Sequence, residues 1–292
     1  MKYDSLRALA DRAEAANQTI GALVIQDEME ESGWSYETVY ERMQYSLQVM
    51  GESVTSGMER DLRSASGLTG GDAHKMSGRM GCSLVGDTFI KALTKAIAVS
   101  ETNACMGRIV AAPTAGSCGI LPACLLTVME DKGVSEEAAV RALFTASAVG
   151  MVIARNATIA GAEGGCQAEC GAASAMAAAA VTEMCGGTPR MVEHACAIAL
   201  KNVLGLVCDP VAGLVEIPCI KRNVMGTANA FAAAEMALAG IDSKIPADEV
   251  IWAMKKVGDS MHSDLRETAR GGLAATPTGK RLTQQVFGTK ED

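Results

Sequence analysis

Alanine is by far the commonest apolar residue in this sequence. Of 292 residues, 49 are alanine and 30 are glycine, whereas only 10 carry an aromatic ring. Alanine is the strongest helix former, and β-strands favour β-branched and aromatic side chains instead. Side chains this small also let neighbouring helices approach one another closely. The composition therefore predicts packed helices and argues against a β-sandwich.

Length and charge narrow the class of protein further. A chain of 292 residues suits one large domain or two modest ones, and 49% apolar residues can form a sizeable core. We expect a single domain over residues 1–292. The 34 acidic and 26 basic side chains give a net charge of −8, without a cluster of Lys and Arg. Binding to nucleic acid or to an anionic membrane is therefore not expected.

The start of the chain and its cysteines indicate a cytoplasmic protein. Residues 1–4 lead into a charged segment rather than into the apolar stretch of a secretion signal. The longest uncharged stretch, 109–129, contains Pro113 and Pro122 and is a poor membrane span, while residues 142–154 suit a buried core helix. Ten cysteines in a reducing compartment are not expected to form disulfides. They raise the question of metal binding or redox chemistry instead.

Helical spacing of apolar residues and good capping residues place the expected helices. These cover residues 4–31 (one helix or two), 35–58, 121–130, 135–155, 172–184 and 246–257, the last with Pro246 at its first position. A short strand is expected at 109–112. Glycine-containing loops at 64–81, 113–119 and 156–165 allow the backbone to approach a ligand. We predict a mainly α-helical, single compact domain with its functional Gly-rich loops between helices.

Four cysteines lie at expected loop or helix-end positions. Cys166, Cys170, Cys208 and Cys219 are spaced by 4, 38 and 11 residues. Structural zinc sites usually have two short cysteine pairs, whereas the ligands of an iron–sulfur cluster need only converge in space. Free cysteine is also a common buried residue, and this reading is preferred for Cys82, Cys105, Cys118, Cys124, Cys185 and Cys196. Spacing alone leaves a cluster on Cys166, Cys208 and Cys219 and a purely structural role both open.

Longer motifs carry a resemblance to a known family. They are GLTGGDA at 67–73, APTAGS at 112–117, GAEGGCQAE at 161–169, GLVCDPVAGLVE at 205–216, PCIKRN at 218–223 and ETARGGLAA at 267–275. Together they resemble the α chain of the iron–sulfur-dependent L-serine dehydratases over nearly the whole sequence. The resemblance implies a [4Fe–4S] cluster held by Cys166, Cys208 and Cys219, with Cys170 as a neighbour.

The resemblance also implies a reaction. A cluster held by three thiolates has one iron without a protein ligand, which can act as a Lewis acid on the β-hydroxyl of L-serine. A base removes the α-proton, and β-elimination of water gives aminoacrylate. Hydrolysis of its imine tautomer yields pyruvate and ammonia. The expected protein is thus an L-serine ammonia-lyase.

Other candidate site residues lie in or beside the glycine-rich loops. Thr114 and above all Ser117, with the amides of their turn, could bind the substrate carboxylate. Lys75 could bind that carboxylate or serve as the base, and its alternative is a solvated lysine. Asn156 and Asn223 adjoin the proposed ligand loops, where they could contact substrate or simply close a turn.

The general base is the least defined group. Histidine is the usual base near neutral pH, but the chain has only His74, His194 and His262. Single-chain relatives carry an additional domain with a Ser-Ser-His loop, and no such segment occurs here. The resemblance therefore implies a separate β chain, which is a second candidate source of the base.

Three alternatives remain to be distinguished. A pyridoxal-phosphate dehydratase would catalyse the same net reaction, but the sequence has neither a βαβ pattern nor a convincing phosphate loop. A related iron–sulfur L-cysteine desulfidase would bind a thiol at the same iron. A non-enzymatic helical partner subunit would carry its cysteines as inert core residues.

Overall fold

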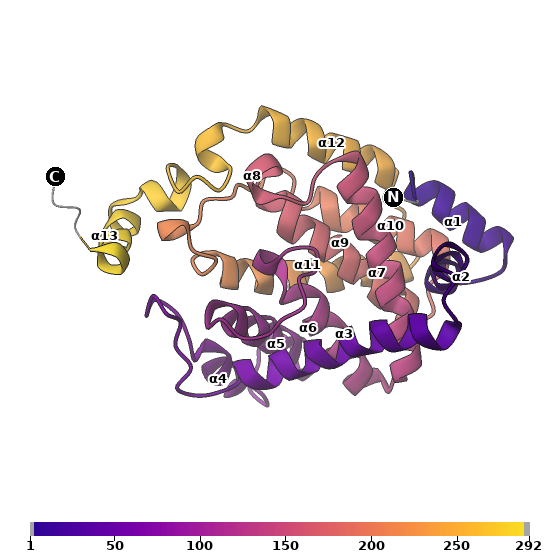
Figure 1. The fold of residues 1–292 in the computed structure, drawn as a ribbon, viewed down its shortest axis with the longest axis horizontal. Helices are drawn as coiled ribbons and strands as arrows, with labels where there is room; N and C mark the ends of the chain where they lie inside the picture. Colours follow the sequence, from indigo (N-terminus) through magenta and orange to yellow (C-terminus); the bar gives the residue numbers. More distant parts are fainter. Residues whose placement is uncertain (1–2, 289–292) are drawn as a thin grey trace.

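The computed structural model describes residues 3–288, which form a bundle of α-helices (Figure 1). No strand occurs in this range, and only an isolated bridge joins Cys208 to Arg266. The mainly α-helical fold class is confirmed; the first two and last four residues of the expected 1–292 domain lie outside the described range. The helices are α1 (Leu6–Ala15), α2 (Ile20–Ser32), α3 (Tyr36–Gly57), α4 (Asp72–Ser77), α5 (Asp87–Ala104), α6 (Ile120–Lys132), α7 (Glu136–Asn156), α8 (Gly161–Gly164), α9 (Ala172–Met184), α10 (Pro189–Lys201), α11 (Cys219–Leu238), α12 (Ala247–Ser260) and α13 (Pro277–Phe287).

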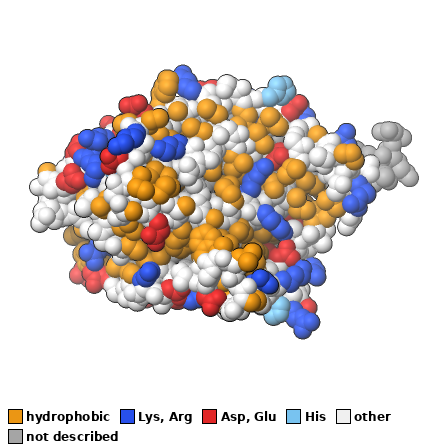
Figure 2. All heavy atoms as spheres, turned by 180° about the vertical axis from the view of Figure 1, so that it is seen from behind, with side chains coloured by type: hydrophobic (Ala, Val, Ile, Leu, Met, Phe, Trp, Pro, Cys, Tyr) orange, Lys and Arg blue, Asp and Glu red, His pale blue; other side chains and the backbone are white. Residues whose placement is uncertain are grey.

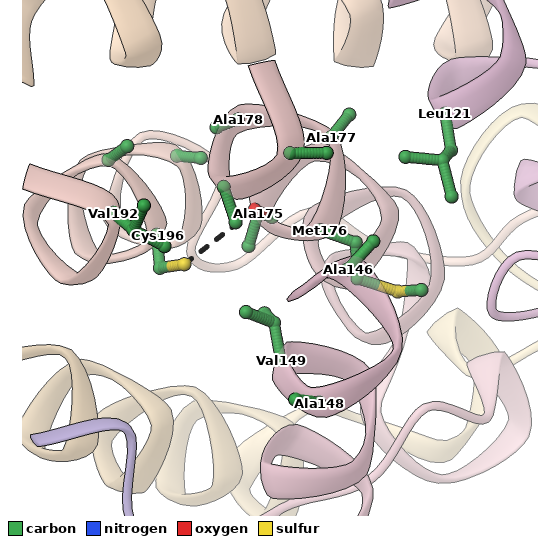
Figure 3. Close-up of a cluster of buried hydrophobic side chains, with 14 of the residues drawn as sticks. Leu121, Ala146, Ala148, Val149, Ala175, Met176, Ala177, Ala178, Val192 and Cys196 are labelled. Atoms are coloured by element: carbon green, nitrogen blue, oxygen red, sulfur yellow. Dashed lines mark hydrogen bonds between the residues drawn. The ribbon is translucent and has the colours of Figure 1, made fainter. Parts of the chain in front are cut away.

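Helix α9 forms the centre of the bundle. It packs against α6, α7, α10 and α11, and every residue from 172 to 182 is buried. Figure 3 shows Ala175, Ala177 and Ala178 of α9 between α7 and α10, with Val149 and Cys196 facing them. Since alanine adds no bulk beyond its methyl group, four neighbouring helices can surround α9 closely. This is the small-residue packing that the composition predicts.

Helices α3 and α5 make a still closer contact. A Cβ atom added at Gly57, the last residue of α3, would lie 1.9 Å from the Ala98 carbonyl oxygen of α5. Gly51, on the same helix, has no atom within 4 Å of such a Cβ. Backbone contact at Gly57 therefore requires the absence of a side chain, whereas Gly51 carries no such constraint.

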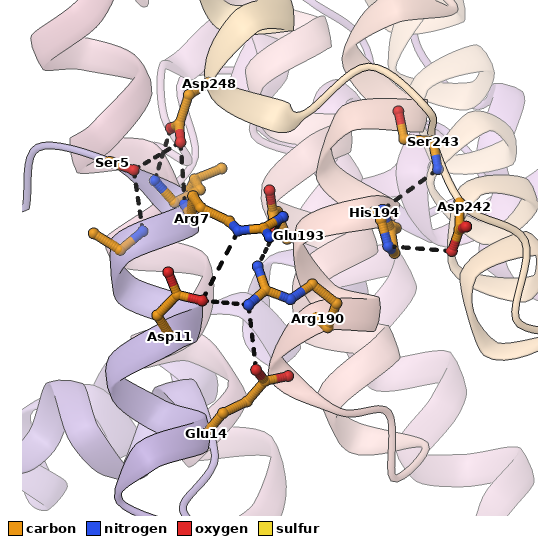
Figure 4. Close-up of polar contacts among 12 residues, drawn as sticks. Ser5, Arg7, Asp11, Glu14, Arg190, Glu193, His194, Asp242, Ser243 and Asp248 are labelled. Atoms are coloured by element: carbon orange, nitrogen blue, oxygen red, sulfur yellow. Dashed lines mark hydrogen bonds and ion pairs between the residues drawn. The ribbon is translucent and has the colours of Figure 1, made fainter.

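Ionic contacts join the first helix to the rest of the bundle (Figure 4). Arg190 of α10 lies between Asp11 and Glu14 of α1 and also pairs with Glu193, at 2.6 Å. At the start of α1, Asp248 of α12 accepts the backbone N–H of Leu6 at 2.8 Å. These contacts hold α1 against α10 and α12.

Most predicted helix boundaries agree with the structure. Ser35 and Ser135 cap α3 and α7 through their side chains, and residues 4–31 form two helices. Helix α12 begins at Ala247, so Pro246 is the residue before the helix rather than its first residue. The predicted strand at 109–112 is wrong: the segment is irregular, because no neighbouring strand offers it ladder hydrogen bonds.

Helix α7 is the described helix with the length and hydropathy of a membrane span, but 67% of that window is buried. It is a core helix, as expected for residues 142–154.

On the face seen in Figure 2, charged side chains are scattered among apolar ones.

Candidate functional site

The three predicted ligand cysteines lie in separate segments. Cys166 precedes a π-helical turn (η2, Gln167–Gly171) that joins α8 to α9, Cys208 follows α10, and Cys219 is the first residue of α11. The backbone N–H of Gln167 donates to the Leu206 carbonyl oxygen at 3.0 Å, which holds the Cys166 loop beside the Cys208 segment.

The sulfur atoms of these cysteines share one electrostatic environment. Burial raises the pKa of Cys208 well above its ordinary value, and negative charge at Glu169 and Cys166 adds to the effect. Burial and then the charge of Cys166 raise the pKa of Cys219 to about 12. The pKa of Cys166 is lowered, chiefly because Cys170 donates a hydrogen bond to it. The fold thus brings Cys166, Cys208 and Cys219 into one neighbourhood, with Cys170 beside them.

Within residues 3–288, no three His, Cys, Asp or Glu side chains are grouped closely enough to hold one metal ion. The thiolates of a polynuclear cluster bind different iron atoms, so their sulfur atoms need only converge around the cluster.

Glu169, which the sequence analysis did not select, connects Cys208 to the 113–119 turn. Its carboxylate accepts the Thr114 hydroxyl at 2.7 Å and the Cys208 thiol at 3.8 Å. A Cβ added at Gly161 would lie 2.7 Å from the same carboxylate. Burial raises the pKa of Glu169. The sequence signal that could have selected Glu169 is its place between Cys166 and Cys170 in a stretch of mostly small residues.

Of the predicted substrate-binding residues, Ser117 lies within this turn and Asn223 of α11 contacts it. Ser117 is buried, and its hydroxyl makes only long contacts of 3.4 Å with carbonyl oxygens, besides one of 3.2 Å with Thr114. The Asn223 amide accepts from the Gly119 N–H at 2.9 Å and donates to the carbonyls of Gly116 and Cys219. Asn223 therefore closes a turn and joins it to the start of α11.

Asn156 and Lys75 are exposed. The Asn156 amide donates to the carbonyls of Asp4 and Val152, at the end of α7, rather than to a cysteine loop. Lys75 pairs with Asp72 at 2.9 Å, and Asp72 also pairs with Lys221 of α11 at 2.8 Å. Lys75 is thus linked to the helix that begins at Cys219, but its ammonium group already has a carboxylate partner.

Two of the histidines pair with carboxylates rather than with a cysteine, although the segment that carries His262 and Asp264 bonds to the backbone of Cys208 through Leu265. His194 faces Asp242 at 3.4 Å, exposed His262 faces Asp264 at 3.6 Å, and His74 is exposed on α4. Neither carboxylate belongs to a segment that carries a predicted ligand.

The glycine-rich loop at 64–71 is fixed next to Cys219 by a buried carboxylate. Glu216, three residues before Cys219, accepts hydrogen bonds from the hydroxyls of Ser64 and Ser66 at 2.8 Å and from that of Thr69 at 2.5 Å. The loop then leads into α4, which the sequence analysis did not predict. The backbone N–H of Asp72 at the start of α4 donates to buried Glu101 at 2.9 Å.

The remaining cysteines divide into three groups. Cys118, Cys124 and Cys196 are buried as expected, and burial raises the pKa of Cys118 to about 12, whereas Cys105 is only partly buried. Cys82 and Cys185 are exposed, and the prediction that they are core residues is wrong. Both lie where a helix has ended: Cys185 directly follows α9, and Cys82 lies in the loop between α4 and α5.

Among the described residues, helices and irregular segments alternate without a strand, and the irregular segments carry Cys166 and Cys208, the latter against the partly buried carboxylate of Glu169. The family model described as serine dehydratase alpha chain matches residues 15–274. The chain is 51% identical over 288 residues to the probable L-serine dehydratase, alpha chain, of Bacillus subtilis, covering 98% of this chain and 96% of that protein. It is 44% identical over 286 residues to the L-serine dehydratase, alpha chain, of Peptoniphilus asaccharolyticus, covering 97% and 98%. The chain belongs to the serine dehydratase alpha-chain family.

A longer relative shows a different chain organisation. The L-serine dehydratase of Streptomyces coelicolor is 51% identical over 181 residues, which are 61% of this chain but 40% of that protein. The matched region is thus less than half of that longer relative. The resemblance deduced from the motifs is confirmed.

Proposed function

We propose that this chain is the α chain of an enzyme that converts L-serine to pyruvate and ammonia by β-elimination of water. It would hold a [4Fe–4S] cluster on Cys166, Cys208 and Cys219 and act with a separate β chain in the cytoplasm. One observation carries the proposal: hydrogen bonds and an ion pair join the segments that carry the three cysteines, in a chain whose full-length relatives are named L-serine dehydratase alpha chains.

The donor set suits an iron–sulfur group. Thiolates are the usual ligands of such clusters, and the neighbourhood offers three cysteines with a cation, Arg222, beside Cys166. Cys166 and Cys208 are buried, whereas Cys219 is partly exposed, so one side of the neighbourhood is accessible. When bound through three thiolates, the cluster would supply an iron open to act as a Lewis acid on the departing hydroxyl.

The chain's own residues would bind and orient the substrate. The Thr114 hydroxyl already donates a hydrogen bond to Glu169, whereas the Ser117 hydroxyl makes no short hydrogen bond. Ser117 is therefore the better donor to the substrate carboxylate. Glu169 would hold the turn beside Cys208, and Asn223 would hold the same turn against α11. Cys208 and Cys219, whose pKa values are raised, must release their protons when they bind iron.

Removal of the α-proton needs a base. Lys75 remains the candidate in this chain, but it is exposed and paired with Asp72. A group on the β chain is the other candidate, because the accessible side of the site at Cys219 could receive a residue from a partner. Elimination releases an enamine whose hydrolysis needs little from the protein.

The test combines cofactor loading with substrate comparison. The purified chain is reconstituted anaerobically with iron and sulfide, with and without the β chain, and assayed on L-serine, L-threonine and L-cysteine. We expect brown protein, with pyruvate formed fastest from L-serine. Faster sulfide release from L-cysteine would identify a desulfidase. A yellow protein with a Schiff-base band would indicate pyridoxal phosphate, and colourless, inactive protein would indicate a non-enzymatic partner subunit.

A further inference from the structure

Arg222 lies three residues after Cys219 in α11, and its side chain is only 15% exposed. Its Nη1 donates to the Val207 carbonyl oxygen at 2.7 Å, and its Nη2 pairs with Asp209 Oδ1 at 2.8 Å. Val207 and Asp209 are the two neighbours of Cys208 in the chain. One guanidinium therefore holds the Cys208 segment from both sides.

The Cys166 loop reaches the same segment through the backbone. Gln167, directly after Cys166, donates its N–H to the carbonyl oxygen of Leu206, the residue before Val207. Because Arg222 itself belongs to the helix that begins at Cys219, it joins that helix to the Cys208 segment, to which the Cys166 loop is bonded. Its two contacts use different nitrogen atoms of the planar guanidinium, which a single lysine ammonium could not reproduce.

Asp209 extends this connection to the C-terminal part of the chain. Its Oδ2 accepts the backbone N–H of Leu273 at 2.7 Å. Gly272 has a φ of +56°, and a Cβ added there would lie 2.3 Å from the same oxygen. A buried ion pair between Arg222 and Asp209 is costly to desolvate and is weak evidence for stability alone. Its position between the cysteine segments points to a specific role.

We propose that Arg222 is a positioning residue for the cysteine set. It holds the Cys208 segment, to which the Cys166 loop is bonded, against the start of α11, and its positive charge would offset the negative charge of the thiolates in a loaded cluster. The second part rests on the proposed function, because it concerns a loaded cluster; the first part concerns the protein chain alone.

The first measurement is hydrogen exchange in the full chain without iron. We expect Arg222→Gln to speed exchange of the backbone amides at 207–209, because their segment loses two of its contacts. Arg190→Gln is the matched control: Arg190 is also a largely buried arginine with several carboxylate partners, but it joins α1 to α10. The control should leave exchange at 207–209 unchanged.

The second measurement follows anaerobic reconstitution with iron and sulfide. Loss of a residue that supports metal ligands typically weakens metal binding by about tenfold to a hundredfold, and we expect this from Arg222→Gln but not from Arg190→Gln. The midpoint potential of any cluster retained should become more negative, because a nearby positive charge is lost. Arg222→Lys keeps the charge and should restore the potential while the 207–209 amides still exchange faster.

Unchanged exchange at 207–209 together with unchanged iron binding in Arg222→Gln would overturn the assignment. If Arg222→Gln does not fold, Asp209→Asn breaks the same ion pair with little change of shape and should show the same two effects. A parent protein that takes up no iron would contradict the proposed function, whereas the exchange experiment would still decide whether Arg222 holds the three segments.

Discussion

The helices around α9 and the segments that carry Cys166, Cys208 and Cys219 bury opposite kinds of side chain. Helix α9 buries mainly alanine side chains, with Met176 and Val181 among the larger ones. The cysteine neighbourhood buries Asp209 and partly buries Glu169 and Arg222, and each of these charged groups needs a partner to offset its desolvation. The α9 region therefore gains stability from close packing. The cysteine region loses some stability because charged groups are removed from water there.

Cysteines themselves show this difference. The Cys196 thiol lies in the alanine core and donates only to the Ala175 carbonyl oxygen, at 3.7 Å (Figure 3). The Cys208 thiol is also buried, but it faces the Glu169 carboxylate. Burial alone therefore does not distinguish a structural cysteine from a candidate ligand; the charged groups around it do.

Replacing these two cysteines should give the largest contrast. We expect Cys208→Ser to lose iron and serine deamination by about a hundredfold or more, because a hydroxyl replaces a cluster thiolate. Cys196→Ser should keep both and lose about 1 to 3 kcal/mol of unfolding free energy, because it buries a hydroxyl in an apolar site. Iron content and pyruvate formation after anaerobic reconstitution, with urea denaturation, measure both effects. Equal iron content in the two variants would remove Cys208 from the ligand set.

The packing side of the comparison can be tested on one helix. Gly57→Ala should lower the free energy of unfolding by about 1 to 3 kcal/mol, because its Cβ would collide with the Ala98 backbone. Gly51→Ala should raise it by up to about 1 kcal/mol, since alanine is the better helix former and the position is open. Urea denaturation of both variants gives the sign. A stabilising Gly57→Ala would show that α3 and α5 can separate without loss.

The buried carboxylate that holds the glycine-rich loop allows a smaller test. Glu216→Gln keeps the shape but weakens three hydrogen bonds from Ser64, Ser66 and Thr69, and we expect a loss of about 1 kcal/mol. Limited proteolysis should cut the variant faster within 64–71, whereas Gly51→Ala should be cut there at the parental rate. Unaltered cleavage of Glu216→Gln would mean that the loop is held by other contacts.

The smallest expected effect is a pH-dependent change in stability at a carboxylate that is buried beside the alanine core. Burial raises the pKa of Glu183, near the end of α9, above its ordinary value of 4.5. The resulting stabilisation is complete below that value and is lost as the pH rises through the raised pKa. Compared with its parent, Glu183→Gln should therefore gain stability as the pH rises above about 4.5, because glutamine does not ionise. A difference that does not change with pH would contradict this.

The predictable part of the fold is the part with regular spacing and strong capping. Helices α3 and α7 begin where Ser35 and Ser135 cap them, and the alanine run gives α9. No predicted range covers the helices α4, α5, α8, α10, α11 and α13. In α11, Pro218 and Gly226 suggest breaks, yet Gly226 lies within the helix because its missing side chain makes room for Ile120.

For the site, spacing and motifs selected the three cysteines, but not the side chains that hold them together. Arg222 and Glu169 acquire their roles from contacts with residues 13 and more positions away. Such contacts are formed only when distant segments meet, and a single sequence carries no record of them. Asn223 was selected as a substrate-binding residue, but its amide is hydrogen-bonded to backbone groups of the folded turn. The sequence alone does not place those groups beside it.

The π-helical turn at Gln167–Gly171 links Cys166 directly to α9. It holds one residue more than a matching α-helical turn, and each residue rotates an α-helix by about 100°. We therefore expect deletion of one residue there to turn Cys166 away from Cys208 while the alanine side chains of α9 keep their places.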